Sequence, residues 1–134
     1  MLGVNFVAVL VATVVNFIIG ALWHGPVFGK TWMRLQGFTP ESVKSMKLKP
    51  MQAMILGFIS TLVMAFVLAL LVGSNLNTAA EALLLAFLLW LGFIVTTLAG
   101  SVLWEGRSVK LFLFNIAYQF VALAATALVL AFWK

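Results

Sequence analysis

The chain contains no cysteine, one histidine and only three acidic residues among its 134. Without cysteine, disulfides, thiolate metal sites and thiol catalysis are excluded. One histidine and three carboxylates are too few for a metal site with the usual number of ligands, and we expect no metal or other cofactor. The sequence also lacks a phosphate-binding loop, paired catalytic carboxylates and a nucleophile elbow. It therefore indicates a protein that is not an enzyme.

Charged residues are scarce as well, and they leave long apolar runs between them. Hydrophobic residues make up 65% of the chain and the mean hydropathy is +1.21, whereas soluble domains are nearer about half apolar. The segments without any Lys, Arg, Asp or Glu are 1–29, 50–80, 82–104 and 111–133. Each is longer than the roughly 20 residues needed to cross about 30 Å of hydrocarbon.

These runs predict an all-α integral membrane protein, a single four-helix bundle with short loops. Continuous apolar runs do not fit the alternating strands of about 10 residues that build membrane β-barrels. In lipid, the backbone of each span must then satisfy its own hydrogen bonds as a helix. The predicted transmembrane helices cover residues 4–23, 51–72, 79–100 and 110–133.

The basic residues predict the orientation of these helices. Five of the eight Lys and Arg residues lie between Lys30 and Lys49, and two more, Arg107 and Lys110, lie between the third and fourth helices. With four spans these seven share one side of the membrane, and Lys134 is alone on the other. The positive-inside rule then places these seven residues in the cytoplasm and predicts that both termini lie outside.

The cytoplasmic loop, residues 24–50, is expected to contact the lipid surface. Basic residues beside a span attract anionic lipid headgroups, and the loop shows no motif for nucleic acid, so no nucleic-acid partner is expected. The sequence Thr39-Pro40-Glu41 is typical of a helix start, with an N-cap, a first-position proline and an acidic first turn. We expect a short interfacial helix over residues 40–46, the alternative being a solvated basic loop.

Few polar side chains lie within the predicted spans, and several recur at helical spacing. Asn5 and Asn16 are eleven residues apart, which is close to three turns of 3.6 residues. Asn115, Gln119 and Thr126 form a similar stripe on the last helix. The candidate residues for helix packing or for a pore are Asn5, Asn16, Ser60, Thr61, Trp90, Asn115, Tyr118, Gln119 and Thr126.

Two interpretations of these stripes remain open. Asn, Gln, Ser and Thr side chains hydrogen-bond between membrane helices, each contributing about 0.6 kcal/mol on average. The same side chains can also line a path for a small neutral solute or an ion. No charged residue lies in the middle of a span, although coupled transporters usually place one there. Helix packing is therefore the favoured interpretation.

A second group of candidates lies at the predicted cytoplasmic rim, where it contacts lipid. Gly25-Pro26 is expected to end the first helix. Glu105 is expected to face Lys30 or Arg34 and to tie the two cytoplasmic loops together. His24 either responds to pH or binds a loop carbonyl. The rim candidates are Trp23, His24, Pro26, Lys30, Trp32, Arg34, Glu105 and Arg107.

Two segments carry a family resemblance. Residues 20–32 contain Gly-x-x-Trp-x-x-Pro-x-x-Gly-Lys-x-Trp, and residues 103–119 contain Leu-Trp-Glu-Gly-Arg followed by Leu-Phe-Leu-Phe-Asn and Tyr-Gln. Their order and spacing resemble the bacterial membrane family called domain of unknown function 1761. The resemblance implies a small four-helix inner-membrane protein with no established activity. The family pattern implies Tyr where this chain has His24, which argues against a mechanism based on that histidine.

The sequence predicts function only in outline. We expect a non-enzymatic multi-pass membrane protein that acts by helix–helix association, as a homo-oligomer or as a small accessory subunit of a membrane complex. The alternative is a homo-oligomeric channel or transporter whose path is lined by the Asn, Gln and Thr stripes. A membrane enzyme would have only His24, Glu41 and Glu105 with which to build a site at the inner interface.

Overall fold

The structure, a computed structural model, describes residues 4–36, 50–73, 76 and 78–133. Within these residues all regular secondary structure is helical. Four helices are long and apolar enough to cross a membrane, which confirms the predicted all-α fold and makes the chain a multi-pass membrane protein. These spans are Phe6–Val27, Met51–Val72, Ala79–Leu103 and Val109–Phe132.

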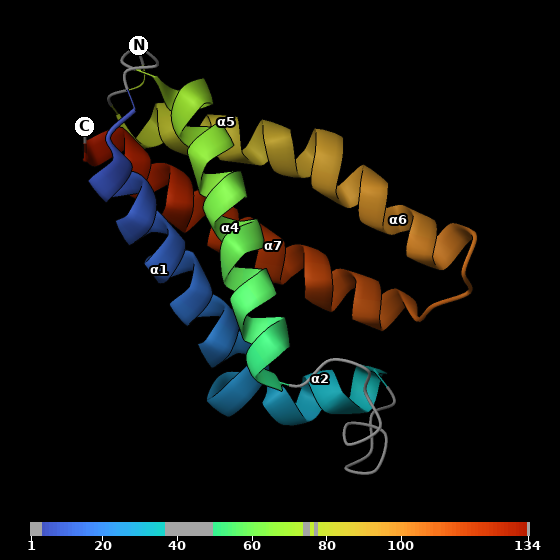
Figure 1. The fold of residues 1–134 in the computed structure, drawn as a ribbon. Helices are drawn as coiled ribbons and strands as arrows, with labels where there is room; N and C mark the ends of the chain where they lie inside the picture. Colours follow the sequence, from blue (N-terminus) through green and yellow to red (C-terminus); the bar gives the residue numbers. More distant parts are fainter. Residues whose placement is uncertain (1–3, 37–49, 74–75, 77, 134) are drawn as a thin grey trace.

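The spans are assembled from α-helices (Figure 1) and from two π-helical segments, which are called η1 and η2. In chain order the elements are α1 (Phe6–Leu22), η1 (Trp23–Val27), α2 (Gly29–Gln36), α4 (Pro50–Val72), α5 (Ala79–Leu89), η2 (Trp90–Val95), α6 (Thr96–Leu103) and α7 (Val109–Phe132).

Polar side chains fix where two of the spans begin. Asn5 Oδ1 accepts hydrogen bonds from the backbone N–H groups of Val7 at 3.0 Å and Ala8 at 3.2 Å, and so caps α1. At the start of α5, Thr78 and Glu81 form a reciprocal capping box. Asn5, expected from its spacing to belong to the polar stripe of the first span, is therefore used locally at the helix terminus.

The first span leaves the bundle through a π turn and a second short helix. The α-helical pattern ends at Leu22, and Phe28 N–H bonds Trp23 O at 3.1 Å across the turn that contains Pro26. Because proline has no N–H to donate, a wider turn accommodates it here. α2 follows directly and was not predicted, because residues 24–50 were expected to form a loop. The predicted interfacial helix over 40–46 lies outside the described residues.

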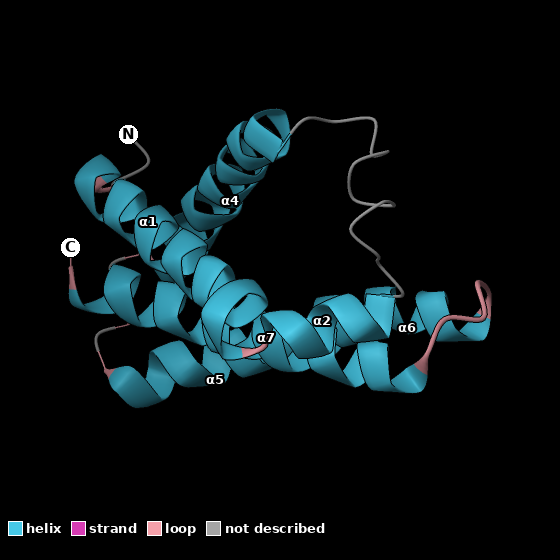
Figure 2. Cartoon of the chain, turned by 90° about the horizontal axis from the view of Figure 1, so that it is seen from below, coloured by secondary structure: helices cyan, strands magenta, loops and turns pink. Residues whose placement is uncertain are grey.

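α7 is the central helix of the fold. It packs against α1 on one side and against α5 on another, while α4 lies across α1 and α7 (Figure 1). Of the most apolar stretch of α7, 33% of the residues are buried, against 11% for the span formed by α5, η2 and α6. α2 lies against α7 (Figure 2). Helix α7 therefore supplies most of the contacts that hold the spans together.

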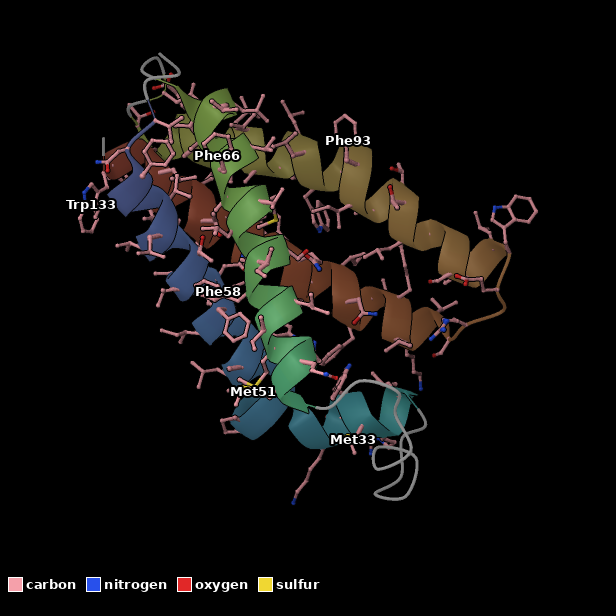
Figure 3. The ribbon with its side chains drawn as sticks, viewed as in Figure 1. Met33, Met51, Phe58, Phe66, Phe93 and Trp133 are labelled. Carbon is pink, nitrogen blue, oxygen red and sulfur yellow. The ribbon has the colours of Figure 1, made fainter. Side chains whose placement is uncertain are left out.

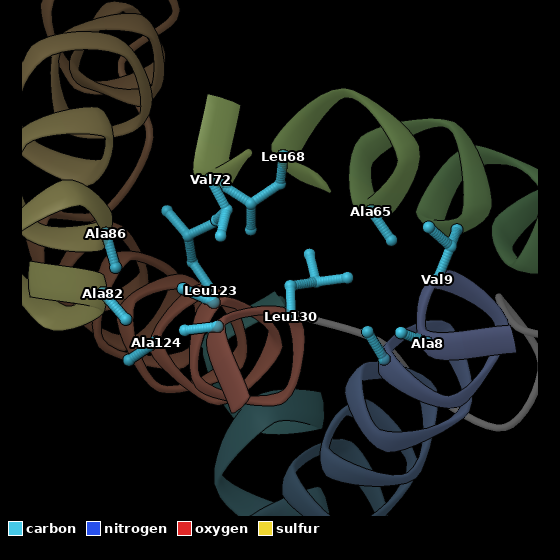
Figure 4. Close-up of a cluster of buried hydrophobic side chains, with 13 residues drawn as sticks. Ala8, Val9, Ala65, Leu68, Val72, Ala82, Ala86, Leu123, Ala124 and Leu130 are labelled. Atoms are coloured by element: carbon cyan, nitrogen blue, oxygen red, sulfur yellow. The ribbon is translucent and has the colours of Figure 1, made fainter. Parts of the chain in front are cut away.

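The buried core lies at one end of the bundle, where α1 begins and α7 ends, and is called here the packed end. It is built largely from alanine, with Leu68, Leu123 and Leu130 filling the space between helices (Figure 4). Small side chains let membrane helices approach closely, which favours van der Waals packing in the absence of a hydrophobic driving force. The core residues are Ala8, Val9, Ala12, Ala65, Leu68, Val72, Ala82, Ala86, Leu123, Ala124, Ala127, Leu130 and Ala131.

The opposite end, where α4 and α7 begin, is looser and is called here the open end. Every residue of α4 from Met51 to Leu56 is exposed. In Figure 2 the first turns of α4 stand away from α7 and α6. The helices are therefore closely packed at the packed end, and the start of α4 diverges from α7 at the open end.

Candidate functional site

A buried hydrogen-bonded junction joins α1 to α7 near the middle of the membrane span. Asn16, with 5% of its surface exposed, donates from Nδ2 to Thr126 Oγ1 at 3.0 Å and to the carbonyl oxygen of Ala122 at 3.5 Å. Thr126 is fully buried and donates its own hydroxyl proton to the same Ala122 carbonyl at 2.7 Å. Two sequence candidates from different stripes therefore meet, and they serve as a link between helices.

This junction also fixes which way the Asn16 amide points. Since Thr126 uses its proton on Ala122 O, its oxygen can only accept, and the group that faces it must be the Asn16 NH₂. The Asn16 carbonyl oxygen then points away from that contact and has no hydrogen-bond partner among the described residues. Asn16 is thus a link on one side and an unpaired acceptor on the other.

A cavity of about 310 Å³ opens beside Asn16, between α1, α4 and α7. Thr61 of α4 lines it, and its hydroxyl donates to the carbonyl oxygen of Gly57 in the same helix at 2.9 Å. Tyr118 of α7 lines it as well, and its hydroxyl makes no hydrogen bond to a described residue. The described lining holds amide, hydroxyl and apolar groups and no charged side chain.

Aromatic and small residues shape the rest of this cavity. Phe17 of α1 meets Phe58 of α4 edge to face, with ring centroids 5.6 Å apart, and Phe58 lies between the two helices in Figure 3. Gly57 leaves open space, since a Cβ atom there would meet Phe17 at an ordinary 3.9 Å. The cavity therefore exists partly because Gly57 provides no side chain to fill it.

Gly20 allows the closest approach in this region. A Cβ atom at Gly20 would stand 2.7 Å from the Tyr118 hydroxyl oxygen, inside van der Waals contact. Glycine at this position therefore lets the end of the tyrosine ring lie close against α1. Because Gly20 is 98 positions from Tyr118, no pattern in the sequence indicates this pairing.

At the open end, Tyr118 joins an aromatic cluster. Its ring lies 4.7 Å from that of His24 and 6.0 Å from that of Trp23, centroid to centroid. Trp23 also packs against Phe28 at 4.7 Å and Phe114 at 5.9 Å. The indole N–H of Trp23 is buried and finds no hydrogen-bond partner in the described part of the chain. Ring packing is therefore what positions this tryptophan.

His24 is held by its own helix. Its Nδ1 lies 2.9 Å from the carbonyl oxygen of Gly20, and a carbonyl can only accept, so Nδ1 carries the proton and donates. The partner is thus a carbonyl of α1 and not the loop carbonyl expected from the sequence. Trp32 of α2 packs edge-on against His24 at 5.1 Å. The histidine connects the end of α1 to α2.

Gly29 lets α2 begin close against the end of the first span. A Cβ atom there would come within 3.0 Å of the His24 backbone oxygen. The backbone at Gly29 therefore lies so close to that of His24, across the turn containing Pro26, that a larger residue would not fit without a shift. Of the rim candidates, Trp23, His24, Pro26 and Trp32 come together here.

The charged rim candidates are dispersed. Lys30 and Arg34 lie exposed on α2, and Glu105 and Arg107 lie exposed in the turn between α6 and α7. Over the residues described, no ion pair joins Glu105 to Lys30 or Arg34. The backbone of the turn is held instead by Arg107 N–H, which bonds Ser101 O at 2.9 Å.

Asn115 and Gln119 stand apart from the other polar candidates. They share the face of α7 on which Thr126 lies, and both are half-buried. Neither side chain hydrogen-bonds to a described residue. An amide in a membrane span without a partner carries a free-energy cost of about 1–3 kcal/mol. These two amides are therefore available to a group from outside the described part of this chain.

The remaining candidates have local or structural places. Trp90 donates its indole N–H to the carbonyl oxygen of Ile116 at 2.7 Å, linking η2 to α7, and its ring meets Phe120 at 5.1 Å. The indole N–H of Trp90 therefore has its hydrogen-bond partner on another helix. Ser60 lies on the exposed face of α4.

Acidic and histidine side chains do not cluster in the described residues. There is no group of three or more of them, with cysteine included in the search, that would hold a metal ion. The chemistry that the cavity offers is neutral hydrogen bonding in an apolar surrounding, from Asn16, Thr61 and Tyr118.

Comparison with known proteins gives one match. The family model described as protein of unknown function (DUF1761) matches residues 7–131, nearly the whole chain. No curated protein and no solved structure matches the sequence. The match covers all four spans together with the Trp23–Trp32 exit and the turn between α6 and α7, the two segments on which the resemblance rested. The chain belongs to the DUF1761 family of proteins of unknown function.

Proposed function

We propose that this protein is a non-enzymatic membrane protein that acts by associating with a second copy of itself through α7. The observation that carries the proposal is the pair of half-buried amides, Asn115 and Gln119, which have no hydrogen-bond partner among the described residues. An amide both donates and accepts, so the same residue of a symmetric second copy can satisfy it.

The position of α4 supports this proposal. At the packed end, Leu68 and Val72 of α4 are buried in the core that includes Leu123 of α7. At the open end, residues 51–56 are exposed on all sides. Asn115 and Gln119 lie nearer that end of α7. Helix α4, which covers α7 at the packed end, does not cover it at the level of these two residues. A helix of a second copy would fill this position.

The mass of the purified protein in mild detergent tests the proposal. We expect a homo-oligomer for the natural sequence and a shift toward monomer when Asn115 and Gln119 are both replaced by leucine. Interhelical hydrogen bonds in membranes contribute about 0.6 kcal/mol each on average. Four such amides across a symmetric dimer would sum to about 2.4 kcal/mol, so the dissociation constant should rise roughly fiftyfold.

The matched control is Thr96→Leu. Thr96 lies exposed in the span formed by α5, η2 and α6, and its hydroxyl bonds only its own helix, at Gly92 O, 2.8 Å. This variant should keep the mass of the natural protein. A monomeric natural protein would refute self-association, and co-purification with a different membrane protein would make the chain an accessory subunit.

The proposed function includes an orientation in a bacterial inner membrane. Two elements lie away from the start of α1 and the end of α7 (Figure 1): α2, which carries Lys30 and Arg34, and the turn from α6 into α7, which carries Arg107 and Lys110. With these residues in the cytoplasm, the end of α7 lies outside. A reporter that works only outside the cytoplasm should therefore be active when it is fused after α7, and a reporter that works only in the cytoplasm should be inactive there. Cytoplasmic activity of that fusion would reverse the orientation.

A further inference from the structure

We propose that the cavity between α1, α4 and α7 binds a neutral, mostly apolar alcohol or phenol that enters from the bilayer. The proposal is independent of self-association, because the cavity is lined by Asn16, Thr61 and Tyr118 and not by Asn115 or Gln119. It rests on three observations: the size of the cavity, its unpaired polar groups and its lack of charge.

The volume suits a small molecule. At about 310 Å³ the cavity is about twice the 150 Å³ of an engineered protein cavity that holds one benzene ring. It also falls at the lower end of the roughly 300–1,000 Å³ range of small-molecule sites. Two fused aromatic rings, or a short chain with a polar head, are of the right size.

The polar groups specify the head of the ligand. The Asn16 carbonyl oxygen is an acceptor, because the NH₂ group is used on α7, and only 5% of the Asn16 surface is exposed. The Tyr118 hydroxyl can donate and has no described partner. A ligand hydroxyl accepts from Tyr118 and donates to Asn16, so it satisfies both groups, whereas an ether or a ketone has no proton for Asn16.

The absence of charge and the location specify the rest of the ligand. Among the described residues no charged side chain lines the cavity, so an ionic group would find no counter-charge in that lining. Phe17, Ala21 and Met54 form apolar parts of its wall, and Ala21 and Met54 are exposed on the outer surface of two membrane spans. The ligand therefore reaches the cavity through the lipid.

Three probes of similar shape test the polar part of the proposal: 1-naphthol, 1-methoxynaphthalene and naphthalene. Binding is measured by titration calorimetry of the full chain in detergent. The concentration of each probe is given as its mole fraction in the micelle, so that differences in partitioning into detergent are removed. A net hydrogen bond between neutral groups implies roughly fivefold tighter binding, so naphthol should bind about fivefold more tightly than either other probe. In Tyr118→Phe this advantage should shrink.

A cavity-filling variant tests the location. Gly57→Leu places a side chain into the cavity, and the first added atom meets only Phe17 Cε2 at an ordinary 3.9 Å. It should weaken naphthol binding at least about tenfold. Gly92→Leu is the matched control, because nothing lies within 4 Å of a Cβ atom there, and it should bind as the natural protein does.

Several results would overturn the proposal. Equal binding of naphthalene and naphthol would make the cavity an apolar slot for a lipid chain. Unchanged binding in Gly57→Leu would place the probe elsewhere. If Gly57→Leu does not fold, an unaltered preference for naphthol in Tyr118→Phe would show that the probe does not contact this cavity. Binding by the Asn115→Leu, Gln119→Leu protein would separate this cavity from the surface between copies.

Discussion

Replacing Gly20 with alanine is expected to leave the protein about 1–3 kcal/mol less stable than replacing Gly57 with alanine. Both substitutions add one methyl group to a membrane helix and gain the same helix propensity, so their difference isolates the local contact. At Gly20 the new atom would stand 2.7 Å from the Tyr118 hydroxyl oxygen, and at Gly57 it would stand 3.9 Å from Phe17. The free energy of unfolding, measured by titration with a denaturing detergent, gives the comparison.

The same contact provides a rescue experiment. The atom that collides is the Tyr118 oxygen, and the next atom of that ring is already at 3.5 Å. Tyr118→Phe removes the oxygen and should cancel most of the cost of Gly20→Ala, while costing little alone. The ring cannot simply swing aside, because His24 packs against it at 4.7 Å. Equal stability of the two alanine variants, or failure of the rescue, would contradict the close approach described.

Replacing Asn16 with leucine is expected to destabilise the protein by about 1–2 kcal/mol. The variant loses the hydrogen bonds to Thr126 and to the carbonyl of Ala122, and interhelical bonds of this kind contribute up to about 1.7 kcal/mol in membranes. In a double-mutant cycle with Thr126→Val, the coupling energy should be about 0.6 kcal/mol. Unfolding free energies of the four proteins give it directly.

Thr13→Val is the control for that cycle. Thr13 is as fully buried as Thr126, but its hydroxyl bonds only Val9 O of its own helix, at 2.7 Å. Its replacement should therefore cost less than that of Thr126. If Asn16→Leu leaves stability unchanged but abolishes solute flux in liposomes, the junction is not a structural link, and the channel interpretation of the polar stripes is favoured.

The four spans follow from the sequence because a membrane imposes a length on every helix. Charge-free runs longer than about 20 residues leave few alternatives, and the predicted span of 51–72 differs from α4 by one residue at its start. α2 was missed because it has only eight residues and lies next to a glycine and a proline, which are typical of loops. The sequence carried a weak signal for this helix, since Lys30 precedes and Arg34 follows Trp32 at a spacing of about one helical turn.

The candidate site was predictable in its residues but not in its pairings. Helical spacing places Asn16 and Thr126 on inward stripes, yet periodicity does not state which helices face each other. Asn5 falls on the same stripe as Asn16, three helical turns earlier, but it lies just before the first helical residue and caps the helix instead. The pairing of Gly20 with Tyr118 depends on how α1 and α7 are rotated and displaced, which only tertiary packing determines.

The central position of α7 sets the order in which this protein can assemble. Asn16 is joined to a partner 110 residues later in the chain, and α7 is synthesised after the other three described spans. Until it enters the membrane, α1 has only α4 as an established neighbour, and the Asn16 amide must tolerate lipid or water. Insertion and folding are thus separate stages for this chain. The earlier helices insert into the bilayer first, and most of their contacts form only when α7 packs against them.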